Sequence, residues 1–257
     1  MEMKNIWKAV LAFMVSISFV AEAGADEYSD IMREANDLYA AEEFQQALDK
    51  YKEIEQAGME SSALYYNMGN SYFRLSDAGN AILYYERSLR LDPSNRDIQT
   101  NLEMARQYTT DRIEQVPEFV MLSWGRNLRT SVSANAWAWI SIIFLAVAAV
   151  LLLLYFYGKT SSIRKICFIF SMVCVLLFLV SMGFSLSQRQ DILNDDYAIV
   201  MAEVSSVRGA PDDSAKGLFV LHEGTKLTVI ENIGNWSRVE LSDGRQGWIL
   251  SEEIEII

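Results

Sequence analysis

Few side chains in this sequence are suited to catalysis or metal binding. The chain contains one histidine, His222, and two cysteines, Cys167 and Cys174, which both lie in an apolar run. A lone histidine in a turn is more often a hydrogen-bonded structural residue than a base or a metal ligand. The cysteines share roughly one helix face and fit helix packing or a membrane-facing position. With no Ser–His–acid or glycine-rich phosphate motif present, we expect a protein that is not an enzyme, with no catalytic residue, metal or cofactor.

The charge of the chain excludes another class of partner. The formal net charge is −12, and the soluble segments on both sides of the apolar runs are acidic without a basic stripe. An acidic surface repels a phosphate backbone. We therefore expect no binding to nucleic acid.

The N-terminus has the pattern of a secretory signal peptide at residues 1–25. Lys4 and Lys8 precede the apolar residues 9–20, and small residues follow at Ala21, Ala23 and Ala25. Such a core is short for a membrane span, and small residues suit signal peptidase. Cleavage after Ala23 or Ala25 is the first interpretation, and an uncleaved anchor is the alternative.

Two further runs, residues 137–157 and 166–186, contain no charged side chain. At about 1.5 Å per residue, each helix would cross the roughly 30 Å hydrocarbon layer of a membrane. The short loop 158–165 carries Lys159, Arg164 and Lys165 and no acid, which indicates a cytoplasmic loop. The sequence therefore predicts a transmembrane hairpin with both soluble domains outside the cytoplasm.

Residues 112–136 connect the first soluble domain to this hairpin, and residues 187–196 link it to the second. Within the first connector, residues 117–129 mix Phe119, Leu122, Trp124 and Leu128 with Arg126 and Arg129. This composition fits a short amphipathic helix on the outer membrane surface. A plain connector is the alternative.

Residues 28–95 repeat with a period of 34, which pairs Ala35 with Gly69, Ala47 with Ala81 and Tyr51 with Tyr85. Each unit contains two amphipathic helical patterns. Small residues allow these helices to approach closely, and the tyrosines fill the space beside them. We predict an all-α repeat domain at residues 26–111, in which residues 94–108 form a capping helix.

The second unit resembles the tetratricopeptide repeat family at Tyr65, Met68, Gly69, Tyr72, Ala81, Tyr85 and Pro93, whereas the first departs at Ala35 and Met59. The resemblance implies a concave groove lined by the first helix of each unit. An asparagine amide both donates and accepts hydrogen bonds, so it suits an extended peptide backbone; simple solvation is the alternative. The clamp for C-terminal carboxylates is absent, because Met32, Asp97 and Asn101 occupy its positions. The expected partner-binding residues are Asn36, Asn67, Asn70 and Asn101, with Tyr66, Phe73 and Arg74 nearby.

From Tyr197 the pattern changes to short alternating strands, which predicts a small all-β barrel at residues 197–257. The candidate strands are YAIVMA, LFVLH, KLTVIEN, WSRVEL and RQGWIL. The segment resembles the bacterial SH3-like domain at residues 207–211 (VRGAP), 223–225 (EGT) and 247–248 (GW), although Ser206 departs from the usual asparagine. The resemblance implies an exported domain that binds cell-wall peptides or glycan. Trp236 and Trp248 are then either a ligand wall or barrel packing.

The order of signal, repeats, hairpin and barrel resembles the BatE family of the Bacteroides aerotolerance operon. The resemblance implies a bacterial inner (cytoplasmic) membrane location with both soluble domains in the periplasm. It also implies association with other Bat proteins, some with von Willebrand factor A domains, and a role in aerotolerance or stress. We expect a membrane-anchored scaffold for protein–protein interaction. A peptidoglycan sensor that signals through the hairpin, or an accessory subunit of an envelope hydrolase or transporter, are the alternatives.

Overall fold

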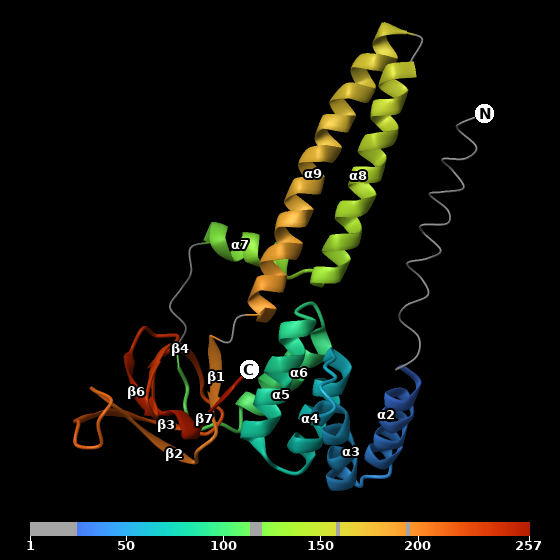
Figure 1. Ribbon diagram of the computed structural model, residues 1–257. Coiled ribbons are helices and arrows are strands. Elements are labelled where there is room, and N and C mark those ends of the chain that lie inside the picture. The colour runs from blue at the N-terminus through green and yellow to red at the C-terminus, as the bar shows by residue number, and fades with distance from the viewer. Residues whose placement is uncertain (1–24, 114–119, 158–159, 194–195) are drawn as a thin grey trace.

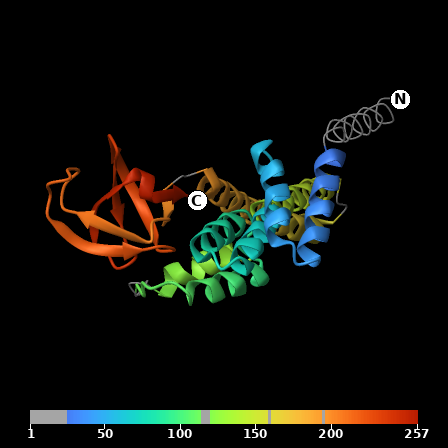
Figure 2. The same cartoon turned by 90° about the horizontal axis from the view of Figure 1, so that it is seen from below.

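The computed structural model describes residues 25–113, 120–157, 160–193 and 196–257. A bundle of short helices and a curved β-sheet lie side by side, and a long helical hairpin projects away from both (Figures 1 and 2). This arrangement confirms the predicted fold class of helical repeats, an apolar hairpin and an all-β barrel. The predicted signal peptide falls on residues 1–24, outside the described part, apart from Ala25.

Three helices of the repeat domain each follow a polar N-cap residue. Oxygen atoms of Ser61, Asp77 and Asn95 accept backbone N–H bonds from the first turns of the helices that follow them, which satisfies otherwise unpaired donors. The turn inside each repeat is the same, because Glu42 and Ser76 both have φ 64°. The helices are α2 (Ala25–Ala40), α3 (Phe44–Gln56), α4 (Ser62–Arg74), α5 (Ala78–Leu91) and α6 (Arg96–Arg106).

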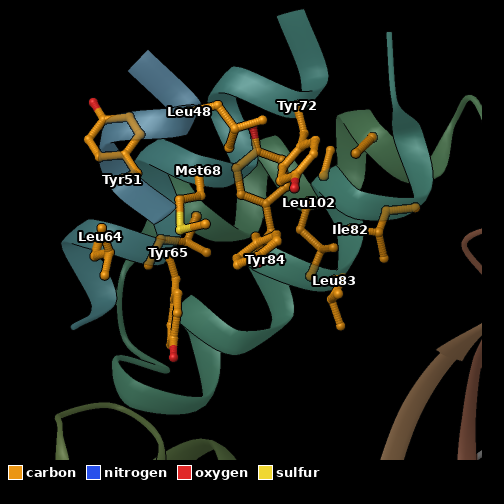
Figure 3. Packing of buried hydrophobic residues seen from close by; sticks show 14 of the residues in the cluster. Leu48, Tyr51, Leu64, Tyr65, Met68, Tyr72, Ile82, Leu83, Tyr84 and Leu102 are labelled. Carbon is orange, nitrogen blue, oxygen red and sulfur yellow. The ribbon is translucent and has the colours of Figure 1, made fainter. Parts of the chain in front are cut away.

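The repeat core is continuous across these helices. Figure 3 shows side chains from neighbouring helices, among them Tyr51, Met68 and Tyr84, turned into one shared interior. A Cβ atom on Gly69 would lie 2.6 Å from Cδ1 of Tyr85. The helices α4 and α5 therefore pack this closely only because residue 69 has no side chain, in agreement with the role predicted for the small residues.

The barrel is a seven-stranded antiparallel sheet in the order β3-β2-β6-β5-β4-β1-β7. Its interior is formed by buried aliphatic side chains from several strands, among them Val207, Leu221, Val239 and Ile249. The sequence pattern did not predict β2 or β7. Strand β2 ends at the first two residues of the VRGAP segment, which was interpreted only as a motif, and β7 has three residues. The strands are β1 (Tyr197–Val200), β2 (Val204–Arg208), β3 (Gly217–His222), β4 (Lys226–Ile233), β5 (Trp236–Glu240), β6 (Gln246–Leu250) and β7 (Ile254–Ile256).

The hairpin consists of α8 (Ala134–Tyr157) and α9 (Ser161–Leu193), both long and apolar enough to cross a membrane. Large apolar side chains point outward, with Phe156 71% exposed and Met172 68% exposed, as a lipid-facing surface requires. Most of the buried residues of the two helices are small, and Ser171 Oγ donates to the Ala148 carbonyl at 3.2 Å. Aromatic pairs, Trp137 with Phe184 and Tyr155 with Phe168, also join the helices. This close packing is typical of membrane helices.

A short helix, α7 (Val120–Arg129), lies across the base of the hairpin (Figure 1). Arg129 pairs with Asp191 of α9, and Trp137 Nε1 donates to the Arg129 carbonyl at 2.8 Å. Trp124 is 71% exposed. The segment is thus helical at the base of the hairpin, and its position on a membrane surface stays a prediction; Phe119 lies outside the described residues. Helix α9 continues beyond residue 186, where its polar end makes these contacts.

The barrel packs directly on the repeat domain. Ile199 of β1 and Ile257 after β7 are buried in the same apolar cluster as the helical core. The two soluble domains are thus joined through α5, a contact between segments far apart in the sequence.

Candidate partner-binding site

Two equivalent polar units line one face of the repeat domain. In the first, Asn36 Oδ1 accepts a hydrogen bond from Tyr51 Oη at 2.7 Å and one from Asn67 Nδ2 at 2.9 Å. We call these three residues the first Asn–Tyr unit. It joins α2, α3 and α4.

The second Asn–Tyr unit repeats the first 34 residues later. Asn70 Oδ1 accepts from Tyr85 Oη at 2.7 Å and from Asn101 Nδ2 at 2.9 Å. Asn101 Nδ2 also lies 3.0 Å from Tyr66 Oη, as its donor. The structure therefore brings together five of the seven predicted groove residues, in two matched groups.

The tyrosine hydroxyls hold the amides in a fixed orientation. Burial raises the pKa of Tyr51 to about 12, and burial likewise raises the pKa of Tyr85. Both hydroxyls are therefore neutral donors at any physiological pH, and the amide oxygen that accepts from each is occupied twice.

The orientation leaves other amide atoms available. Within the described residues, no bond to Asn36 Nδ2, Asn67 Oδ1, Asn70 Nδ2 or Asn101 Oδ1 is formed. Each unit thus offers one donor group and one acceptor, which is the pair that a peptide backbone presents in return. The sequence predicted amides that donate and accept hydrogen bonds, and the structure adds the orientation in which these amides are held.

The other two predicted groove residues have different surroundings. Arg74 stacks over the ring of Phe44 at 4.2 Å and pairs with Glu42 at 3.7 Å, so its charge is directed to the first repeat. Phe73 contacts Tyr108 edge-on, with ring centroids 5.5 Å apart. Phe73 thus packs against the turn that follows α6.

Sequence reasoning missed residues on α6 and in the turn that follows it. Met104 is 45% exposed and lies three residues after Asn101 on α6, which places the two side chains on one helix face. Tyr108 is 73% exposed and lies in the turn that follows α6. Tyr51 and Tyr85 were predicted as space-filling residues only. The 34-residue spacing of Asn–Tyr pairs was the signal that could have identified their hydrogen bonds.

The two barrel tryptophans share one face of the sheet. Trp248 pairs with Arg238 of β5 and with Arg208 of β2, and the Arg208 guanidinium lies 5.5 Å from the Trp236 ring centroid. Val239 and Ile249 point to the opposite, interior face. Neither tryptophan belongs to the aliphatic cluster of the interior. Trp236 is nevertheless buried, at 9% exposed, with Arg208 over its ring, whereas Trp248 is half-buried.

Two family profiles match parts of the chain. The bacterial SH3 domain matches residues 203–255, and the tetratricopeptide repeat matches residues 62–95. No curated protein matches the chain. The matched segments are the barrel and the α4–α5 pair, so the chain carries domains of the kinds that bind proteins or the cell wall.

Proposed function

We propose that the chain is a non-enzymatic, membrane-anchored scaffold that holds an extended segment of a partner protein in its repeat groove. The observation that carries this proposal is the pair of Asn–Tyr units, in which buried tyrosines orient amides that lack a bond on their outer side. Main-chain recognition of this kind tolerates many partner sequences.

The hairpin sets the compartment in this proposal. The loop between α8 and α9 carries the basic residues Lys159, Arg164 and Lys165, so it lies in the cytoplasm and both soluble domains lie in the periplasm. The partners are other envelope proteins, in particular Bat proteins with von Willebrand factor A domains, and the role is in aerotolerance or envelope stress. A phosphatase reporter fused after Ile257 is expected to be active, and activity of a cytosolic reporter only would contradict the topology.

The test of the groove is Asn70→Asp in the full-length protein. An aspartate keeps both accepted bonds, from Tyr85 and Asn101, but replaces the outward donor with a negative charge. We expect co-purification of partners from membranes to fall about tenfold or more, because a peptide carbonyl then faces a carboxylate.

A matched control is Asn95→Asp. Asn95 caps α6 by accepting from Asp97 N and Ile98 N, and an aspartate accepts the same bonds. It adds the same charge outside the Asn–Tyr units. Equal loss of partners in both variants, or loss in neither, would contradict the groove proposal.

A second function is favoured by the barrel face. The stacked Arg208 and Trp236, with Trp248 beside them, suit the sugar and peptide groups of peptidoglycan, so a wall sensor is the competing proposal. Retention of the full-length protein on purified peptidoglycan, lost in Trp248→Ala but not in Asn70→Asp, would favour the sensor over the scaffold.

A further inference from the structure

We infer that the barrel is the C-terminal cap of the repeat domain and that Glu86, Arg106 and Lys226 are positioning residues for the second Asn–Tyr unit. A short repeat stack leaves an apolar end face that another element must cover. Here α6 covers part of it, and the barrel covers α5 with Ile199, Ile257 and the partly buried Met201.

The barrel and α5 are in tight contact. Glu223 Oε1 accepts from the backbone N–H of Gly79 at 3.1 Å, and a Cβ atom on Gly79 would lie 2.2 Å from that oxygen. Gly224 has φ +85°, and its Cβ would lie 2.6 Å from Thr109 Cγ2 and 2.9 Å from Ile82 Cδ1. The barrel turn therefore packs closely on α5: Glu223 lies directly over Gly79, and Gly224 has the positive φ that favours glycine and lies against Thr109 and Ile82.

A buried carboxylate joins three elements at this junction. Glu86 of α5 is 5% exposed, with Arg106 Nη2 of α6 at 2.6 Å and Lys226 Nζ of β4 at 2.7 Å. A buried carboxylate requires such partners, because burying an unpaired charge is costly. The three charges therefore fix the distance between α5, α6 and the barrel.

Helices α5 and α6 also carry two of the three residues of the second Asn–Tyr unit, Tyr85 and Asn101, while Asn70 lies on α4. Tyr85, adjacent to Glu86, holds Asn70, and Asn101 lies one helical turn and a half before Arg106. Since the Asn70–Asn101 bond spans α4 and α6, it depends on where α6 sits against α5. The ion pairs of Glu86 with Arg106 and Lys226 thus set the distance between Asn70 and Asn101.

The segment leaving α6 is held as well. Asp111 accepts from His222 N at 2.7 Å and from Thr225 Oγ1 at 2.8 Å, and its other oxygen lies 2.8 Å from His222 Nδ1. The first unit has a more distant link, through Arg87, which donates to the Ile256 carbonyl at 2.7 Å and pairs with Glu55 at 3.5 Å. The barrel should therefore control the second unit more than the first.

The test measures amide hydrogen exchange in the full-length protein in nanodiscs. In Lys226→Met and in Glu86→Gln, we expect amides of α6 to exchange roughly 10- to 100-fold faster, the factor that loss of a charged hydrogen bond gives. Exchange in α2 should change little. Lys226→Arg keeps the charge and should restore protection, which distinguishes positioning from a general folding defect.

Lys216→Met is the matched control, because Lys216 is an exposed lysine of the same barrel whose side chain has no hydrogen bond or ion pair among the described residues, while its carbonyl bond to Gly209 N is made by the backbone and survives the substitution. Wild-type exchange of α6 in both junction variants, or equal acceleration in Lys216→Met, would overturn the inference. The consequence for partner capture rests on the proposed function. Faster exchange with unchanged partner yield would keep the cap and reject the groove, whereas wild-type exchange would reject the cap alone.

Discussion

Truncation of Ile199 tests whether a barrel residue stabilises the repeat domain. Ile199 is 0% exposed and lies in the apolar cluster of the helices rather than in the barrel interior. Removing its buried methyl and methylene groups in Ile199→Ala should lower the free energy of unfolding by about 2–5 kcal/mol, the range for truncation of a buried aliphatic side chain to alanine.

The assay is hydrogen exchange of α5 amides combined with urea unfolding of the full-length protein. If α5 exchanges through opening of the joint domain, the loss predicts roughly 30- to 5,000-fold faster exchange there. Val204→Ala is the control, because Val204 is on the same barrel but 60% exposed, and we expect a change within about 0.5 kcal/mol. Faster exchange confined to barrel strands, with α5 unchanged, would refute the reasoning.

Three other results are expected. Burial alone would raise the pKa of Glu86, but Lys226 and Arg106 hold it below its ordinary value of 4.5. The ion pairs therefore stabilise the fold above that pH, and this stabilisation is lost as the pH falls through the lowered pKa. The urea midpoint of the wild type should thus fall more steeply in acid than that of Glu86→Gln. The pKa of Glu223 is raised, first by burial and then by Asp77, so the charged form of this carboxylate is less stable in the folded protein than in the unfolded chain. Glu223→Gln should therefore unfold at the same or a slightly higher urea concentration at neutral pH. Trp248→Ala should lower the free energy of unfolding by about 1–2 kcal/mol, because the ring is half-buried on the outer face of the sheet. A loss of about 3–5 kcal/mol would indicate core packing instead.

Local sequence patterns were sufficient for the fold class. The 34-residue period predicted the paired helices, and the uncharged runs predicted the hairpin. Both patterns arise within one or two neighbouring elements. Strand alternation predicted most of the barrel but missed β2, which runs into the VRGAP segment, and β7, which has only three residues.

The junction between the domains could not be predicted in this way. Lys226 and Glu86 are 140 residues apart, and a single charge pair has no periodicity. The groove residues were predicted from the resemblance to a repeat family, but their bonds to Tyr51 and Tyr85 became visible only when three helices were placed together. The sensor alternative assumed a path through the hairpin, whereas the structure has a direct contact through α5.

The most direct test of the central claim is photocrosslinking from the groove in intact cells. A benzophenone amino acid at position 104, which is exposed beside the second Asn–Tyr unit, should form adducts with an envelope protein, and Asn70→Asp should abolish them. The same group at position 204 of the barrel should not form those adducts. Adducts that persist in Asn70→Asp, or that arise equally from position 204, would contradict a partner held in the groove.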